Sequence, residues 1–235
     1  MSNARIEVES DEPGSAAWWQ AHAERLERRR PRAGGLTVER LVDAALSLVA
    51  RDGLDSLTVR SLASSLGTSS ATLYRHVASI DELLVLMVDR VLGGIDLLDD
   101  ERPARERVTH ISWEFRRVLL EHPGIVPALR ASPLLGPNAM RGAEAGLAGF
   151  LAMGFDDDIA VRGYLALIDY VLGSVFFDTA SGGERNARAS SLSSRTRTDT
   201  ALATHSDAIR SASSDEVFGL GVEAFLDGLE QHHSR

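Results

Sequence analysis

This 235-residue sequence lacks or has little of several residue types and segments, and each absence excludes a class of protein or site. There is no cysteine, which excludes a disulfide framework and a cysteine-ligated zinc site. Aromatic residues make up only 6% of the chain while alanine and leucine are plentiful, a composition that favours an all-α protein. No apolar run reaches the length of a membrane span, and the polar start is unlike a signal peptide. We therefore expect a cytoplasmic protein without a membrane partner.

The sequence also lacks the common signatures of catalysis. Its seven histidines show neither HxxxH nor HExxH spacing, and GxSxG, P-loop and GxGxxG motifs are absent. Three consecutive aspartates at 156–158 cannot all lie on one face of a helix, so we expect them to cap a helix rather than bind a metal. The sequence therefore predicts no catalytic residues, no metal and no cofactor, and a protein that is not an enzyme.

Charge is distributed unevenly along the chain. The formal net charge is -9, yet residues 1–80 hold ten arginines and ten acidic residues and are neutral overall. Residues 81–235 hold fifteen arginines against twenty-four acidic residues and carry the whole excess. A neutral N-terminal part followed by an acidic remainder is typical of a protein that contacts nucleic acid through one end only.

The stretch TVRSLASSLGTSSATLYRHV, residues 58–77, predicts two short helices joined by a tight turn. Apolar residues recur at helical spacing before Gly67, a residue type that ends helices and begins turns. Either Ser69 or Ser70 is expected to cap the second helix. Hydroxyl groups at the start of that helix, with an aromatic and two basic groups at its end, suit a recognition helix in the DNA major groove. Periodicity alone leaves open a plain surface αα-hairpin.

This stretch and its flanks resemble the N-terminal domain of TetR/AcrR-family transcriptional regulators. The matching segments are ERLVDAALSLVARDGLDSLTVRSLASSLG and SSATLYRHVASIDELL, and the ending LYRHV followed by DELL is their most specific part. The rest of the chain matches only in size and helical character. The helical segments expected along the chain total nine or ten. The resemblance implies that a three-helix helix-turn-helix DNA-binding domain precedes a larger helical domain for ligand binding and dimerisation in an all-α fold.

Three regions are expected on this basis. Residues 1–35 form a partly disordered N-terminal extension, 36–80 the DNA-binding domain, and 81–235 the effector-binding and dimerisation domain. Residues 181–200 are rich in serine, arginine and glycine and predict a disordered loop. Residues 16–31 predict a short helix with both nearby tryptophans on one side. Its basic end is either an arm that grips DNA phosphate or a minor groove, or the solvated side of a helix packed on the body.

The resemblance and the local chemistry together place the DNA contacts on and beside the second helix of the hairpin. The predicted DNA-binding residues are Thr58, Thr68, Ser69, Ser70, Thr72, Tyr74, Arg75 and His76. The expected partner is a double-stranded palindromic operator bound by a homodimer. The resemblance implies a repressor that a small apolar or aromatic effector releases from DNA. An activator or a ligand-independent DNA-binding protein of the same fold is the alternative, followed by a helical protein-interaction module.

The body of the chain predicts a dimer contact and an effector pocket. Dimerisation is expected through the helices 157–178 and 214–231, with a seam of Gly163, Ala166, Leu167, Val171, Gly173, Ser174, Phe218, Leu220 and Phe225. The predicted ligand-binding residues are Trp113, Arg116, Met140, Phe150, Tyr164, Ile168 and Phe176. Glycines among these bulky residues suggest room for a ligand. For both sets the alternative is plain packing in the core of one monomer.

Overall fold

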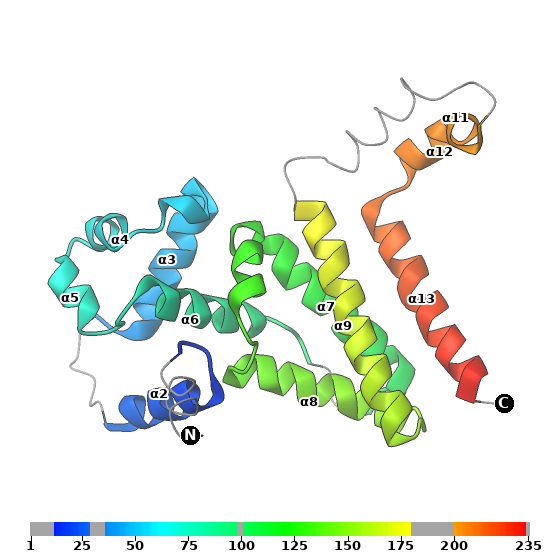
Figure 1. The fold of residues 1–235 in the computed structure, drawn as a ribbon, viewed down its shortest axis with the longest axis horizontal. Coiled ribbons are helices and arrows are strands. Elements are labelled where there is room, and N and C mark those ends of the chain that lie inside the picture. Colours follow the sequence, from blue (N-terminus) through cyan, green and yellow to red (C-terminus); the bar gives the residue numbers. More distant parts are fainter. Residues whose placement is uncertain (1–11, 29–35, 98–100, 180–199, 234–235) are drawn as a thin grey trace, which may run out of the picture. The chain divides into compact units, whose positions relative to one another are not determined.

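A computed structural model describes residues 12–28, 36–97, 101–179 and 200–233 of the chain (Figure 1). Every regular element among these residues is a helix, which confirms the all-α expectation. In chain order the elements are α2 (Ala16–Arg28), α3 (Val38–Asp52), η1 (Leu54–Ser56), α4 (Val59–Ser65), α5 (Ser70–Tyr74), α6 (Ile80–Leu92), α7 (Ala104–Glu121), η2 (Pro123–Ala131), α8 (Pro137–Ala152), α9 (Asp157–Thr179), α11 (Ala201–Thr204), α12 (Ser206–Ser211) and α13 (Ser214–His233).

The described residues hold eleven α-helices and two 3-10 helices, more than the nine to ten helices expected. One reason is that the chain forms two short helices, α11 and α12, on either side of His205. Two expectations lie outside the described residues. These are the disordered start of the N-terminal extension, before residue 12, and the loop expected at 181–200, apart from its last residue.

Side-chain caps set the starts of several helices. Thr37 Oγ1, Ser79 Oγ and Asp156 Oδ1 each accept a hydrogen bond from the amide three residues later, at 3.2, 3.0 and 2.9 Å. Such a cap satisfies one of the backbone donors that the first turn of a helix leaves unpaired. The capping role predicted for the aspartates at 156–158 is therefore confirmed for Asp156.

The chain divides into two compact units. Unit 1 comprises the residues up to Ile95 together with Glu121–Glu144, and unit 2 comprises Asp96–Leu120 and Ala145–Arg235. Unit 1 thus contains α2 to α6, η2 and the first half of α8, which is more of the chain than the expected DNA-binding domain. Unit 2 contains nearly all of α7, the second half of α8, α9 and the C-terminal helices.

The core of unit 1 forms where α3, α6 and η2 meet. Leu41, Leu83 and Met87 are completely buried there. Gly124 allows η2 to approach α3 closely, because a Cβ at this position would lie 2.7 Å from Val49 Cγ1. Burial of apolar side chains in this way is the main source of stability for helices as short as these.

The first turn of α8 is fixed to α6 by Asp89, which is 7% exposed. The Asp89 Oδ1 atom accepts hydrogen bonds from the backbone N–H groups of Asn138 and Ala139, both at 3.0 Å. Burial raises the pKa of this carboxyl, while the two amide donors act in the opposite direction. Asp89 therefore ties two elements of unit 1 together through a cap supplied from another helix.

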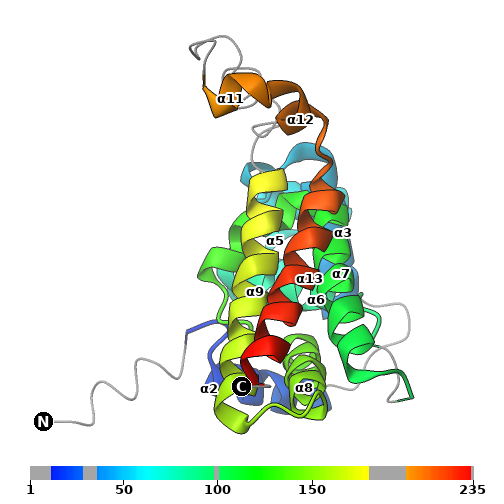
Figure 2. The same cartoon turned by 90° about the vertical axis from the view of Figure 1, so that its right-hand side faces the viewer.

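In unit 2, α9 and α13 run side by side (Figures 1 and 2). The inward side of α9 carries Gly163, Leu167 and Val171, all of which are buried. The Tyr170 hydroxyl lies 3.1 Å from the carbonyl oxygen of Phe218 on α13. The two helices approach closely at this point because Gly221 has no side chain, and a Cβ there would overlap the tyrosine hydroxyl.

These contacts correct part of the predicted dimer seam. Leu167, Val171 and Phe218 are at most 5% exposed within one chain, so they belong to the core of the monomer, as the alternative proposed. Gly163 packs against Phe150 of the same chain rather than against a second copy. Leu220, in contrast, is 73% exposed. The predicted seam therefore overlaps only in part with the outward positions of α9 and α13, which include Ala166 and Leu220.

The hydropathy of α9 also corrects an expectation. By length and composition alone this helix is apolar enough to cross a membrane, whereas the sequence was expected to hold no such run. Core helices of soluble proteins share this property. The buried positions at Ala160, Gly163, Leu167, Val171 and Val175 recur at spacings of three and four, which is the pattern of a helix with one side in a core.

Candidate nucleic-acid interface

The helices α4 and α5 form a helix-turn-helix. Gly67 takes a φ of 61° in the turn, the left-handed conformation that glycine adopts without strain. The amide of Thr68 then bonds to the Ala63 carbonyl at 2.9 Å and closes the turn. Leu62 and Leu73, 1% and 2% exposed, anchor the two helices on the core. The two-helix prediction for residues 58–77 is confirmed, with α4 ending at Ser65.

Hydrogen bonds connect the polar side chains along α5. Ser69 is the cap of this helix, because its Oγ accepts from the Thr72 amide at 3.3 Å. The hydroxyl groups of Ser69 and Thr72 are 3.0 Å apart, and Arg75 Nη2 donates to Thr72 Oγ1 at 3.3 Å. Tyr74 stands beside them with 57% of its surface exposed. Hydroxyl and phenol groups both donate and accept, so this row can meet either phosphate oxygens or base edges.

All eight residues predicted to contact DNA lie in one local region, at the caps and along the surface of α4 and α5. Most are exposed, and the more enclosed ones are Thr68, Thr72 and His76. Ser61 was missed as the partner of Thr58 at the start of α4. Its amide bonds to Thr58 Oγ1 at 3.0 Å and its hydroxyl accepts from the Thr58 amide at 3.0 Å, which fixes the start of α4 reciprocally. The Thr-x-x-Ser spacing was the signal that would have found it.

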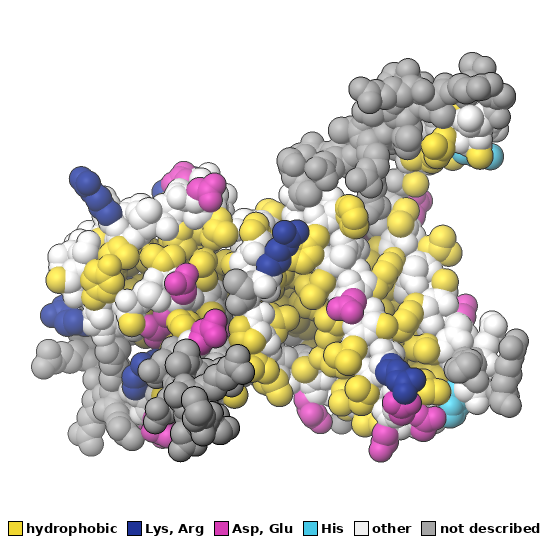
Figure 3. Space-filling model, viewed as in Figure 1, with side chains coloured by type: hydrophobic (Ala, Val, Ile, Leu, Met, Phe, Trp, Pro, Cys, Tyr) yellow, Lys and Arg dark blue, Asp and Glu magenta, His cyan; other side chains and the backbone are white. Residues whose placement is uncertain are grey.

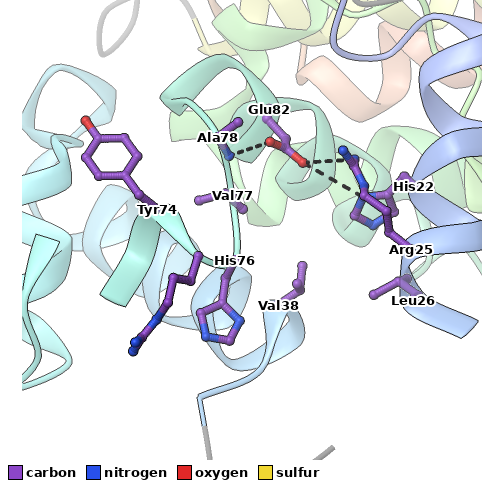
Figure 4. A pocket seen from close by; sticks show the side chains of 10 residues that line it. His22, Arg25, Leu26, Val38, Tyr74, His76, Val77, Ala78 and Glu82 are labelled. Carbon is purple, nitrogen blue, oxygen red and sulfur yellow. Dashed lines mark hydrogen bonds and ion pairs between the residues drawn. The ribbon is translucent and has the colours of Figure 1, made fainter. Parts of the chain in front are cut away.

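The segment just after α5 is held by a buried carboxylate that sequence reasoning also missed. Glu82 is 4% exposed, and its Oε2 accepts a hydrogen bond from the Ala78 amide at 2.5 Å. On its other side, Oε1 accepts from Arg25 Nη2 of α2 at 3.4 Å (Figure 4). The signal for a structural role was the Ser79-x-x-Glu82 spacing at the start of α6.

A second buried charge lies in unit 2. Arg116 is 2% exposed, and its guanidinium bonds to Asp178 Oδ2 at 2.6 Å and to Asp215 Oδ1 at 2.8 Å. The Phe218 ring lies 5.0 Å from the guanidinium carbon, within cation–π range. Asp178 is close to the end of α9 and Asp215 close to the start of α13. Arg116 therefore joins α7 to the helix ends on both sides of residues 180–199.

Two family models match the chain in these regions. The model described as "Bacterial regulatory proteins, tetR family" matches residues 41–87, which include α4 and α5. The model described as "Tetracyclin repressor-like, C-terminal domain" matches residues 99–233, more than half of the chain. The chain belongs to the TetR family of bacterial regulatory proteins. It is accordingly a DNA-binding transcriptional regulator.

Individual relatives agree with this assignment. An HTH-type transcriptional regulator of Saccharopolyspora erythraea is 34% identical over 197 residues, which is 81% of each chain. The HTH-type transcriptional repressor DrrR1 of Streptomyces coeruleorubidus is 34% identical over 156 residues, 62% of this chain and 56% of the repressor. Among solved structures, the TetR-family protein ActR of Streptomyces coelicolor in complex with actinorhodin superposes with a TM-score of 0.76. It is 30% identical and covers 85% of this chain and 98% of its own.

Most of the ligand-binding residues predicted for this TetR-family protein lie in unit 2. Trp113 and Tyr164 are partly buried and pack on the apolar cluster that contains Phe150, while Ile168 and Phe176 are partly buried on α9. Met140, in contrast, belongs to unit 1 and is 50% exposed. Arg116 is near the others, but its guanidinium already binds two aspartates.

The glycines that suggested room for a ligand are in close contact with bulky side chains. A Cβ at Gly146 would lie 3.0 Å from the Tyr164 ring, and one at Gly149 would lie 2.7 Å from Val108 Cγ2. These glycines therefore let rings and helices approach rather than leave an empty space. A cavity of about 400 Å³ does lie in unit 1, between α2, α3, α6 and the start of α8, and none of the predicted ligand-binding residues lines it.

Proposed function

We propose that this TetR-family regulator is a repressor that binds a palindromic operator as a homodimer and is released by a small apolar or aromatic effector. The observation that carries the proposal is the row of hydroxyl and guanidinium groups connected by hydrogen bonds along α5, together with the exposed phenol of Tyr74. Such groups match the donors and acceptors of phosphates and base edges in the major groove. The proposal assigns DNA reading to residues 36–80, effector binding to residues 81–235, and a regulatory, non-catalytic role in the cytoplasm to the whole chain.

The outer surface of α9 and α13 supports the homodimer. Hydrophobic side chains spread over the face where these helices run (Figure 3). The large apolar residues exposed on the two helices are Val161, Leu165, Phe177, Val217 and Leu220. An exposed apolar patch of this kind is stabilised when another apolar surface covers it. A second copy of the chain would supply the same patch, which gives the two-fold symmetry that a palindromic operator requires.

An effector site in unit 2 is supported by the aromatic residues that surround its core. Trp113 packs edge-on against Phe218 with ring centroids 4.7 Å apart, and Tyr164 lies against Gly146. Both side chains are partly buried. If their rings turn outward to another rotamer, a ligand can take the place that they occupy beside the core. ActR, a structural neighbour, binds actinorhodin, and by analogy we propose an aromatic or apolar effector for this chain. A ligand-independent regulator, or an activator, of the same fold is the alternative.

Fluorescence anisotropy with labelled DNA tests the proposal. Palindromic duplexes taken from the DNA that flanks the gene are compared with scrambled duplexes of the same base composition, at one fixed salt concentration because phosphate contacts depend on salt. We expect the palindrome to bind at least about a thousandfold more tightly. An aromatic compound that binds the protein and raises its melting temperature should weaken operator binding by some factor. The operator should weaken binding of the compound by the same factor. Equal affinity for palindromic and scrambled DNA would contradict the proposal.

A further inference from the structure

α2 lies outside the stretch matched by the TetR-family N-terminal model, which begins at residue 41, yet it is packed into unit 1. Trp18 and His22 are each 6% exposed, and their rings stack with centroids 4.9 Å apart. A helix with an aromatic pair buried to this extent is part of the folded unit rather than a solvated arm. The added helix is therefore placed to act on the DNA-binding helices.

Glu82 connects α2 to the segment that follows the recognition helix α5 (Figure 4). One carboxylate oxygen binds the Ala78 amide at 2.5 Å, and the other binds Arg25 Nη2 at 3.4 Å. The His22 Nδ1 atom lies 3.9 Å from the second oxygen. A carboxylate that is 4% exposed depends on such partners, because water does not solvate it. One buried group is thus shared between the added helix and the residue after Val77.

The link through Glu82 lies at the edge of a cavity that α2 and the end of α5 both line. This cavity of about 140 Å³ lies between the C-terminal half of α2 and residues 74–78. Figure 4 shows Leu26 and His76 on different sides of this space, with Glu82 at its edge. The hydrogen-bonded bridge from Arg25 through Glu82 to Ala78 therefore joins two elements that line this cavity from different sides.

Ala78 is the position where such a bridge affects the recognition helix. The amides of His76 and Val77 still bond back to the Leu73 carbonyl, at 2.8 and 3.1 Å. The next amide along the chain, that of Ala78, bonds to Glu82 instead. The carboxylate therefore accepts a hydrogen bond from the first backbone amide after the hydrogen bonds of α5 end. Its orientation sets the direction in which the chain leaves this helix.

We propose that His22 and Arg25 are positioning residues for DNA recognition. They hold the Glu82 carboxylate in the orientation that binds the Ala78 amide. In this role α2 fixes the end of the recognition helix α5 without contacting DNA itself. The proposal rests on the proposed function of α5 as the DNA-reading helix. Without Arg25, Oε1 of Glu82 loses its charged donor, the carboxylate samples other orientations, and the last turn of α5 loosens.

The first variant that tests this is Arg25→Gln, which neutralises a side chain that is 55% exposed and leaves the core untouched. Two quantities are measured on the full chain: hydrogen exchange of the Ala78 amide without DNA, and operator affinity by anisotropy over a series of salt concentrations. We expect exchange to become about tenfold faster and operator binding about tenfold weaker, the size of one lost charge-assisted hydrogen bond. The slope of log K against log salt should stay unchanged, since no phosphate contact is lost.

Arg90→Gln is the matched control. Its side chain is 58% exposed in the same unit and donates to Asp43 at 3.2 Å, so it loses a comparable ion pair that does not reach Ala78. Both measured quantities should stay at the wild-type value in this variant. A Glu82→Gln background provides a second check. If Arg25 acts through the carboxylate, Arg25→Gln should have little further effect there, and the two substitutions should be strongly non-additive.

Two results would overturn the positioning role. A fall of about one in the salt slope for Arg25→Gln would mean that this arginine contacts phosphate directly. Unchanged exchange of the Ala78 amide would mean that the bridge does not restrain the end of α5. The exchange experiment contains no DNA, so its outcome is independent of operator binding. Failure of the wild-type protein to prefer any palindrome would count against the proposed function instead.

Discussion

The two units of this regulator present different surfaces to a partner. On unit 1, the surface of α5 presents two hydroxyl groups and a guanidinium connected by hydrogen bonds, together with the exposed phenol of Tyr74. On unit 2, the outer surface of α9 and α13 exposes several large valine, leucine and phenylalanine side chains. Both surfaces belong to helix pairs over an apolar core. The outward residues alone make one of them suited to a polar, charged partner and the other to an apolar one.

Both units also contain buried charged side chains, and Glu82 in unit 1 and Arg116 in unit 2 are satisfied differently. Glu82 is bound by a neutral backbone amide and by an arginine that is largely exposed. Arg116 is bound by two carboxylates, and the side chain of one of them, Asp178, is only 11% exposed. Removing a partner from a buried ion pair leaves a charge that water does not solvate. The network in unit 2 should therefore be the more costly one to break.

The largest expected effect follows from Arg116→Met. This change leaves Asp178 without its main charged partner, and we expect the free energy of unfolding to fall by about 3–5 kcal/mol. Urea denaturation followed by circular dichroism measures it. Arg162→Met is the control, because that arginine pairs with Asp158 on the exposed side of α9 and should cost less than about 1 kcal/mol. Equal losses in the two variants would remove the contrast between the buried and exposed pairs.

The next effect concerns the apolar surface. Leu220→Asp places a charge where 73% of the leucine surface is exposed in one chain, so the monomer should fold normally. The proposed dimer should weaken by about 2 kcal/mol or more, because the charge would be buried between two copies. Light scattering over a dilution series measures this. Leu202→Asp, at another exposed leucine on α11, should leave the dimer intact. A wild-type mass that corresponds to the monomer at micromolar concentration would refute the dimer itself.

The polar surface is tested by Tyr74→Ala. The side chain is 57% exposed, so folding should be unaffected, whereas operator binding should weaken by about 1–2 kcal/mol if the phenol lies at the major groove. Anisotropy gives the affinity and circular dichroism the helix content. Tyr74→Phe separates the hydroxyl from the ring, since it keeps the ring and loses only the hydrogen bond. Operator affinity that is unchanged in the alanine variant would remove Tyr74 from the interface.

The smallest effect is a pH dependence in unit 2. Hydrogen bonds from Arg117 lower the pKa of Glu114 from its ordinary 4.5 to about 2. A depressed carboxyl pKa stabilises the folded state above pH 4.5, and this contribution is lost as the pH falls toward 2. Because Arg117 is exposed, we expect less than about 1 kcal/mol. The stability difference between wild type and Glu114→Gln, measured in urea at pH 6 and pH 3, should shrink at the lower pH. A difference that does not change with pH would contradict this.

The helix caps and the turn were predicted well because they depend on residues close together along the chain. Ser69, Ser79 and Gly67 act on residues within four positions, so their type and spacing already determine where a cap or a turn forms. The hairpin of α4 and α5, with its polar surface, was therefore predictable in detail. The same reasoning placed the exposed hydroxyl groups of α5, because the apolar positions of the helix had been assigned to the core.

What the sequence did not predict depends on contacts between distant residues. Arg116 meets Asp178 and Asp215, which lie 62 and 99 positions away, and no local pattern distinguishes it from an arginine that orients a ligand. On α9 and α13 apolar residues lie on more than one side, so periodicity does not determine which side faces the core. Phe218 was accordingly placed in the dimer seam although it is 1% exposed in the monomer.

The contact between Tyr170 and Gly221 has a consequence for how the family can vary. A Cβ at position 221 would overlap the tyrosine hydroxyl, so no other residue fits there while the tyrosine remains in place. Loss of the tyrosine ring would in turn open a gap beside α13. The two positions should therefore change together during evolution. In relatives that share this crossing of α9 and α13, a side chain larger than glycine at the second position should accompany a small residue at the first.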